Sequence, residues 1–270
     1  MKVIAFHSYK GGTGKTHLSS NLAAILAKHG HKTALVDFDF RGPNLHTLFG
    51  VEAETTINDW LYHSNTLRPF DILIDFEPKF SIPLHVAFAS TDFRKIGEVI
   101  RADKKQRQEA LKKILQLKDA LANEFDYLII DTAPGVQMES IDGLVISDIV
   151  CLVLKIDDFD IAGTRSMISQ LYALLDSKNF IILNRVVTSN CPSPAEEQQN
   201  IENITQVVKD EMSSYQNEIS EEMMLEVISA ISCYCDLARL GSRELFAVTH
   251  PDHPFTLAVE SLAKRLSLVI

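Results

Sequence analysis

The sequence is poor in the features that mark secreted and membrane-spanning proteins. It has four cysteines among 270 residues, too few for the disulfide framework on which small secreted domains depend. No apolar run reaches the roughly 18 residues that a membrane-spanning helix needs. The N-terminus lacks the length and the small-residue cleavage site of a signal peptide. We therefore expect a cytoplasmic protein whose thiols are reduced.

The chain also lacks an excess of positive charge. Lys and Arg number 26 against 36 Asp and Glu, which gives a formal net charge of −10, whereas general DNA-binding proteins usually present a basic face. Much of the negative charge lies between Thr188 and Glu226. Within this stretch, Ser193, Pro194 and Glu196 form the pattern of a helix start. We therefore expect an acidic helical segment at about residues 188–226.

The composition is that of a globular protein, with 46% hydrophobic and 23% charged residues. Short β-rich runs alternate with longer helical runs, a pattern typical of the α/β class. We expect one domain over residues 1–270, with a doubly wound, mostly parallel sheet and helices on both faces. The predicted strands are Val3–His7, Thr33–Phe38, Leu84–Ala89, Tyr127–Ile130, Ile149–Lys155 and Phe180–Asn184, and the clearest later helices are Lys104–Glu124 and Ile161–Leu175.

The strongest local signal is the glycine-rich run from Lys10 to Thr16, which stands between the first predicted strand and a helical run. Glycines let a backbone wrap closely around phosphates, and the start of a helix offers unpaired N–H groups to an anion. In such a loop Lys15 contacts the β- and γ-phosphates and the Thr16 hydroxyl binds Mg²⁺. The alternative is a glycine-rich turn with incidental lysines.

This loop departs from the general phosphate-loop pattern because Tyr9 stands where that pattern has glycine, and because Lys10 precedes a double glycine. Lys10 to Thr16 resembles the deviant Walker A motif of the MinD/ParA ATPases. Three further segments are similar to motifs of that family and come in the same order. They are Val36–Gly42 for the first switch, Tyr127–Gly135 for Walker B and the second switch, and Ile182–Arg185 for the adenine contact.

The resemblance implies a P-loop ATPase that binds ATP and Mg²⁺, hydrolyses ATP and is a homodimer in its ATP state. It implies that Asp39 orients the attacking water, that Lys10 crosses to the partner's ATP, and that Asp37 supports the first switch. Lys10, Lys15 and Asp39 are thus the expected catalytic residues, and Thr16, Asp39 and Asp131 the expected Mg²⁺ site. The expected ATP contacts are Lys10, Gly11, Gly12, Thr13, Gly14, Lys15, Thr16, His17, Asn184 and Arg185.

The sequence leaves open what the ATP cycle serves. The first hypothesis is a switch that positions or partitions a partner, with an unidentified protein as that partner. Lys264 and Arg265 before an apolar tip would suit a membrane anchor, but they also suit an ordinary last helix. A basic cluster could contact nucleic acid or acidic lipid, or form a solvated helix face. It consists of Arg101, Lys104, Lys105, Arg107, Lys112 and Lys113.

The second hypothesis is delivery of a metal or iron–sulfur cofactor, for which Cys233 and Cys235 are the candidate ligands. Their spacing resembles that of some nickel-insertion ATPases, but the pair comes later in this chain, in a loop expected near the nucleotide's base. His250 and His253 could complete a tetrahedral zinc site with them. The alternative is buried small thiols and capping histidines. A third hypothesis, a metabolic ligase similar to dethiobiotin synthetases, is disfavoured by Lys10 and by the two aspartates of the first switch.

Overall fold

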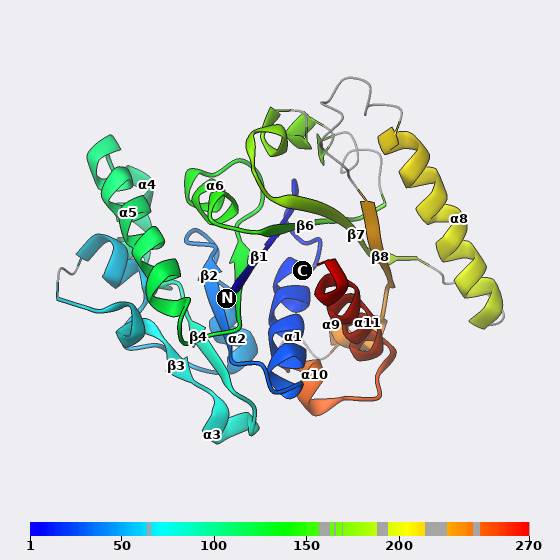
Figure 1. The fold of residues 1–270 in the computed structure, drawn as a ribbon, viewed down its shortest axis with the longest axis horizontal. Helices are drawn as coiled ribbons and strands as arrows, with labels where there is room; N and C mark the ends of the chain where they lie inside the picture. The colour runs from blue at the N-terminus through cyan, green and yellow to red at the C-terminus, as the bar shows by residue number, and fades with distance from the viewer. Residues whose placement is uncertain are drawn as a thin grey trace.

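The chain forms an eight-stranded sheet with the order β3-β4-β2-β5-β1-β6-β7-β8 (Figure 1). The computed structural model describes residues 1–63, 66–156, 163–164, 166–168, 170–187, 194–213, 226–239 and 244–269. All pairings between these strands are parallel except that of β3 with β4. The strands are β1 Lys2–His7, β2 Thr33–Phe38, β3 Ile74–Asp75, β4 Leu84–Ala87, β5 Tyr127–Thr132, β6 Ile149–Leu154, β7 Lys178–Val186 and β8 Glu226–Ser232.

The six strands predicted from the sequence are all present, with ends that differ by one or two residues. Their near-continuous apolar character follows from burial on both faces of the sheet. Strands β3 and β8 were not predicted. Strand β3 has only two residues, too few for any periodicity, and β8 includes Ser229 and Ser232 and lies at the edge of the sheet.

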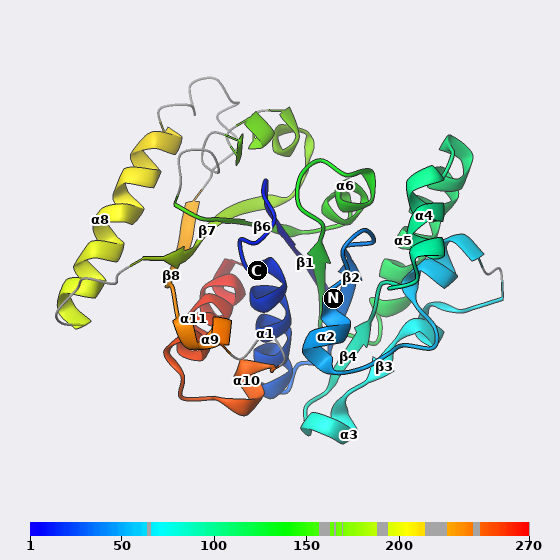
Figure 2. The ribbon, with the colours of Figure 1, turned by 180° about the vertical axis from the view of Figure 1, so that it is seen from behind.

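Helices cover both faces of the sheet, as expected of a doubly wound fold. Figures 1 and 2 show α1 and α11 side by side on one face, and their apolar side chains join one hydrophobic core there. Residues of α5, α6 and α8 join a second core on the other face. The α-helices are α1 Lys15–Lys28, α2 Leu45–Phe49, α3 Glu77–Phe80, α4 Phe93–Arg101, α5 Lys104–Leu121, α6 Met138–Val145, α8 Pro194–Ser213, α9 Cys235–Arg239, α10 Phe246–Thr249 and α11 Pro254–Val269, with shorter helical turns η1 Asp59–His63, η2 Pro69–Ile72 and η3 Tyr172–Leu174.

The predicted helix Lys104–Glu124 is confirmed as α5, which begins with a capping box between Asp103 and Gln106 and ends at Leu121. Helix α8 lies within the expected acidic segment, and its Val208 is buried. The remaining residues of that segment, 188–193 and 214–225, lie outside the described part of the chain. The predicted helix Ile161–Leu175 is helical at the described residues 163–164, 166–168 and 170, and the run ends in the turn η3.

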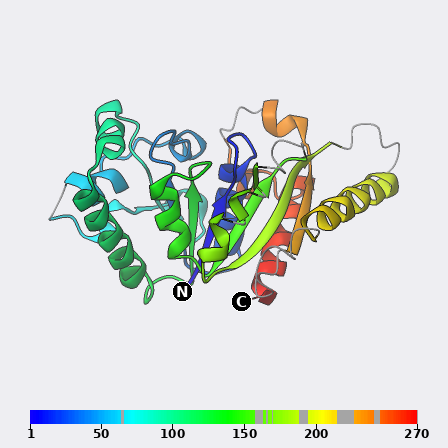
Figure 3. The ribbon, with the colours of Figure 1, turned by 90° about the horizontal axis from the view of Figure 1, so that it is seen from above.

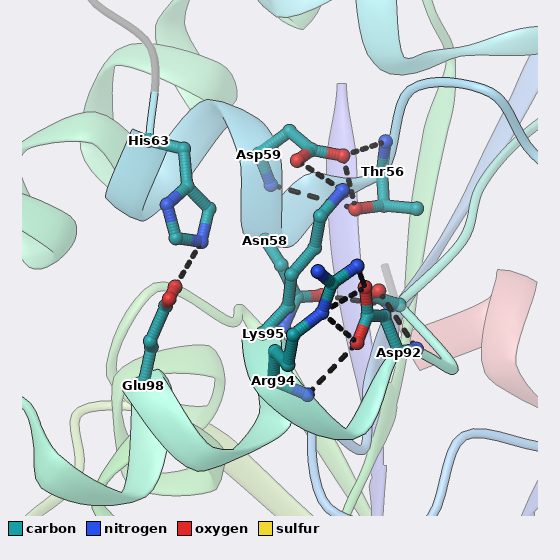
Figure 4. A network of polar contacts seen from close by, with 9 residues as sticks. Thr56, Asn58, Asp59, His63, Asp92, Arg94, Lys95 and Glu98 are labelled. Atoms are coloured by element: carbon teal, nitrogen blue, oxygen red, sulfur yellow. Dashed lines mark hydrogen bonds and ion pairs between the residues drawn. The ribbon is translucent and has the colours of Figure 1, made fainter.

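The two ends of the sheet carry different helices: α4 and α5 lie beside β3 and β4, and α8 lies beside β8 (Figure 3). Helix α4 is held to the turn η1 by an ion pair of Lys95 with Asp59 and by a 2.8 Å contact between Glu98 and the His63 ring (Figure 4). Within the basic cluster, Lys113 donates to the Trp60 carbonyl at 2.7 Å. Part of this cluster is therefore structural.

Helix α11 is a core helix, since Val259, Leu262 and Leu266 are all buried against α1 and the sheet. These three side chains are used in packing, whereas Leu268, in the apolar tip after Lys264 and Arg265, is exposed. None of the helices in the described ranges is long and apolar enough to span a bilayer.

Candidate functional site

The glycine-rich loop joins the end of β1 to the start of α1, at the carboxyl edge of the central strands, where open α/β sheets bind their ligands. Gly14 has φ +96°, in the left-handed region that favours glycine. A Cβ at this position would also lie 2.3 Å from Nδ2 of Asn184. Since no side chain caps the start of α1, its first N–H groups can bind an anion.

Lys15 is held inside the loop. Its side chain is almost fully buried, and Nζ donates to Oγ of Ser8 at 2.8 Å. Ser8 Oγ donates in turn to the Lys10 carbonyl at 2.6 Å. Ser8 therefore ties the ammonium to the loop backbone, a positioning role that the sequence motif did not indicate.

Two buried carboxylates face this loop. Asp37 and Asp131 are register partners on β2 and β5. Burial raises the pKa of Asp131 to about 6, the neighbouring Asp39 adds to the rise, and Lys15 and the Thr16 and Ser19 hydroxyls oppose it. Burial also raises the pKa of Asp37 well above its usual range, and the Asp131 charge raises it further.

These carboxylates are not fully satisfied by the protein. Oδ1 of Asp131 and Oδ2 of Asp37 are buried without a hydrogen-bond partner in the described part of the chain. An unpaired buried carboxylate is costly, and a hydroxyl beside carboxylate oxygens is a donor set suited to hydrated Mg²⁺. The predicted residues Thr16 and Asp131 are therefore together, and they fit a cation that brings its own water.

Asp39 lies in the loop after β2, half-buried at the entrance to the site. Its backbone N–H donates to Oδ1 of Asp37 at 2.9 Å, and its own Oδ1 accepts from the Gly42 N–H at 2.9 Å. These bonds fold the loop back towards Asp131. Arg41 in the same loop lies 3.9 Å from the buried Glu139 of α6, so this loop also contacts the helix that follows β5.

A cavity of about 320 Å³ opens between the glycine-rich loop and the loop after β2. Asn44, Thr47 and Leu48 also line it, and only their position after the first switch could have indicated them from the sequence. Lys10 is partly exposed and is not one of the lining residues. The predicted residues that line it are Gly11, Gly12, Gly14, Lys15, Thr16, His17, Asp39 and Arg185.

A second cavity of about 190 Å³ adjoins the first, because Gly14, His17 and Arg185 line both. Asn184 lies between them, and its Nδ2 donates to the Thr13 carbonyl at 2.7 Å. The Asn184 amide thus clamps the loop as well as lining the second cavity. Burial lowers the pKa of His17, and the nearby Arg185 lowers it further, so this pocket disfavours a second positive charge.

His7, at the end of β1, was not predicted as a site residue. It is fully buried, and its Nδ1 lies 2.7 Å from Oγ1 of Thr132, whose hydroxyl donates to the Phe6 carbonyl at 2.8 Å. Nδ1 therefore carries the proton. Burial lowers the pKa of His7 to about 3, and the charge on Lys15 lowers it further. A neutral imidazole beside Lys15 leaves the ammonium as the local positive charge.

The two candidate cysteines are not the buried thiols of the alternative interpretation. Cys233 and Cys235 are both exposed and line the second cavity. The histidines have other partners: His253 contacts Asp236 at 2.8 Å, and His250 contacts Thr249 at 2.8 Å. In the described ranges, no three His, Cys, Asp or Glu residues are placed to share a metal ion. The four-residue zinc site is therefore not formed in this part of the chain.

Known proteins resemble this chain in sequence and in fold. The family model described as an AAA domain matches residues 1–183. The chromosome-partitioning ATPase Soj of Treponema pallidum is 31% identical over 163 residues, which cover 60% of each chain. The iron–sulfur cluster carrier protein of Saccharolobus solfataricus is 27% identical over 271 residues, covering 97% of this chain and 82% of that one.

One solved structure shows how far the fold similarity extends. The septum site-determining protein MinD complexed with Mg-ADP, from Pyrococcus horikoshii OT3, is 20% identical and superposes with a TM-score of 0.70. The match covers 99% of this chain and 96% of that one. The family match, the glycine-rich loop and the parallel sheet all agree: this chain belongs to the MinD/ParA family of P-loop ATPases.

Proposed function

We propose that this protein is a Mg²⁺-dependent ATPase that forms a homodimer when it binds ATP and uses this cycle to position or partition a partner. The observation that carries the proposal is the buried Asp131 carboxylate, whose Oδ1 has no partner in the described part of the chain although Lys15 and Thr16 lie beside it. An ion and a triphosphate would supply the missing contacts.

The chain's own groups suit the triphosphate. The N–H groups at the start of α1 and the Lys15 ammonium offer donors and positive charge at the cavity of the glycine-rich loop. Thr16, Asp131 and Asp39 would hold Mg²⁺, with the carboxylates acting through the ion's water shell. When bound, Mg²⁺ would help to neutralise the charge that develops on the phosphate.

Hydrolysis needs a positioned water and a further positive charge on the transferring phosphate. Asp39, half-buried on the cavity wall and fixed by Gly42, is placed to accept a hydrogen bond from that water. Lys10 does not line its own chain's cavity, so we assign it to the ATP of the partner subunit. Hydrolysis would then depend on dimerisation.

At the other end of the nucleotide, the second cavity would take the base. Asn184 and Arg185, near the end of β7, line this cavity together with His17 of α1. Asn184 holds Thr13 with its Nδ2, which leaves its Oδ1 as the side-chain group able to accept from an adenine amino group. The Soj and MinD names support partitioning or positioning as the outcome of the cycle.

Cofactor delivery is the second candidate. It is favoured by the two exposed thiols, Cys233 and Cys235, and by the similarity to an iron–sulfur cluster carrier. The thiols line the base cavity together with Gly14 and His17. A carried metal ion would therefore compete with the nucleotide for space, which makes the switch the better-supported proposal.

Native mass spectrometry of anaerobically purified Asp39→Ala protein with Mg²⁺ and ATP tests these proposals together. Blocked hydrolysis should trap a dimer that holds two ATP molecules, and adding Lys10→Ala should weaken that dimer while leaving ATP bound. A monomer with bound ATP would contradict the dimer switch and favour a metabolic ligase. Stoichiometric iron, nickel or zinc in the dimer would favour cofactor delivery.

A further inference from the structure

Cys233 and Cys235 follow directly on the last strand of the sheet. Ser232 ends β8 opposite Val186 of β7, and the Cys233 N–H donates to the Val186 carbonyl at 2.8 Å. The chain then passes through Tyr234 to Cys235, where α9 begins. Because β7 and β8 are parallel, the two thiols reach the same edge of the sheet as Arg185.

The turn that carries the thiols is well anchored. The Tyr234 ring packs edge-on against His253 and Phe255, with centroid distances of 5.3 and 6.4 Å. His253 is itself held by Asp236 at 2.8 Å. The thiols therefore belong to a fixed wall of the 190 Å³ cavity, opposite Gly14 and His17 of the nucleotide loop.

The two thiols differ in access from Cys151, which lies in β6 and is fully buried in the core. Burial raises the pKa of the Cys151 thiol, which keeps it protonated and inert, since the thiolate is the reactive form. Cys233 and Cys235 are exposed to solvent at the cavity, where the Arg185 guanidinium is a neighbouring cation. Reagents and ligands that enter this cavity meet both sulfur atoms.

We propose that Cys233 and Cys235 are thiol-modification sites that compete with the nucleotide, so that bound nucleotide shields them and an adduct on either excludes the nucleotide. This inference rests on the proposed function, because it requires the 190 Å³ cavity to take the base end of ATP. Ligand pockets usually exceed about 300 Å³, so a cavity of this size has no room for a base and a peptide-sized adduct together.

The reactant class is a low-molecular-weight disulfide such as oxidised glutathione. A cysteine thiol loses its proton to water, and the thiolate attacks one sulfur of the disulfide. A protein–glutathione S–S bond forms while the glutathione S–S bond breaks, and the second glutathione leaves as a thiolate that takes up a proton. The protein sulfur is oxidised and the leaving sulfur reduced. Reduced glutathione reverses the step.

The test uses the full chain with Cys191→Ser, because Cys191 lies outside the described residues, and oxidised glutathione as the probe. Intact mass should show up to two adducts, and peptide mapping should place them at Cys233 and Cys235 and not at Cys151. Saturating Mg-ADP should slow the reaction at least tenfold. Equal rates with and without Mg-ADP would overturn the proposal.

The reverse coupling is measured by the binding of a fluorescent ADP analogue. The glutathione adduct should weaken binding at least tenfold, and dithiothreitol should restore it. In a Cys233→Ser/Cys235→Ser variant, oxidised glutathione should leave the binding that the variant retains unaltered. Loss of binding in that variant on treatment, or full binding by the modified Cys191→Ser protein, would contradict the proposal.

Failure of this inference and failure of the proposed function are distinguishable. If the untreated protein binds no adenine nucleotide in equilibrium dialysis, the proposed ATPase function is wrong and the inference falls with it. If the untreated protein binds nucleotide and Mg²⁺ but modification has no effect on binding, the ATPase proposal stands and only the role of the thiols is wrong.

Discussion

Two polar regions of this molecule use the same residue types in opposite ways. In the network between α4 and η1, Asp59 and Asp92 pair with Lys95 and Arg94, and the carboxylate of Glu98 contacts the His63 ring (Figure 4). At the nucleotide site, Asp37 and Asp131 each keep a buried oxygen without a partner in the described part of the chain. In the first region the protein itself supplies partners for the carboxylates. In the second, a ligand is needed to supply the missing partners.

The pKa shifts follow this difference. Burial alone would raise the pKa of Asp59, but hydrogen bonds from Lys95 and Thr56 outweigh it and lower the pKa. Burial raises the pKa of Asp131 to about 6, and the hydroxyls of Thr16 and Ser19 only partly offset it. A carboxylate paired inside the protein stabilises the fold, and one left unpaired destabilises it until a ligand binds.

The largest expected effect concerns a residue at the edge of the nucleotide site. Lys10→Ala should lower the ATP hydrolysis rate by about 10³-fold, since charges supplied in trans are worth about 10³–10⁵ in rate in other NTPases. Nucleotide binding should change far less, because Lys10 does not line its own cavity. Steady-state phosphate release measures the rate. Lys28→Ala, at the other end of α1, is the matched control, and equal rates for the two variants would exclude the role in trans.

Neutralising Asp131, whose Oδ1 has no hydrogen-bond partner in the described part of the chain, should stabilise the nucleotide-free fold. Asp131→Asn removes a buried charge whose pKa is raised from 3.8 to about 6, so the free energy of unfolding at pH 7 should rise by about 1–3 kcal/mol. Urea denaturation without nucleotide measures this change. A loss of stability would mean that the carboxylate is already satisfied in the folded protein.

The same residue predicts a pH dependence. Because the folded pKa of Asp131 lies above the unfolded value, the folded state binds the extra proton between about pH 4 and pH 6. This group's contribution to stability is greatest below pH 4 and is lost as the pH rises through 6. The stability gap between Asp131→Asn and the natural protein should therefore be small at pH 4.5 and widen up to pH 7.5. Paired urea titrations would show a flat gap if Asp131 does not titrate in this range.

The smallest effect is expected for a substitution in the network between α4 and η1. Asp59→Ala removes the partner of Lys95 and two hydrogen bonds to Thr56, at 3.0 and 2.7 Å. Because Asp59 is partly exposed, the loss should be about 1 kcal/mol, with the rate of ATP hydrolysis unchanged. Thermal unfolding and phosphate release measure the two quantities. Asp119→Ala, on the exposed face of α5, should change neither, and a large rate loss in Asp59→Ala would connect this network to the active site.

The sequence predicted the parts of the molecule whose signals are local. Apolar strands, the helix α5 and the glycine-rich loop all depend on residues within a few positions of one another, and each is found in the structure. Short β3 and the half-polar edge strand β8 were missed because they have little periodicity of their own. Their place depends on pairing with β4 and β7.

The contacts between the residues of the site were harder to predict than the identity of those residues. The motif order indicated Lys15, Thr16, Asp131 and Asn184, and the structure brings them together. It could not indicate that Ser8 would hold Lys15, or that neutral His7 would lie beneath the loop. These partners meet across the fold, without a fixed spacing in the chain.

The most direct test of the central claim is the Mg²⁺ dependence of ATP binding in the natural protein and in Asp131→Asn. Equilibrium titration with a non-hydrolysable ATP analogue, in Mg²⁺ and in EDTA, gives four affinities. If the Asp131 carboxylate helps to hold the metal ion, Mg²⁺ should raise the affinity of the natural protein for the ATP analogue at least tenfold. It should hardly change the affinity of the variant. An equal gain in both proteins would contradict the claim.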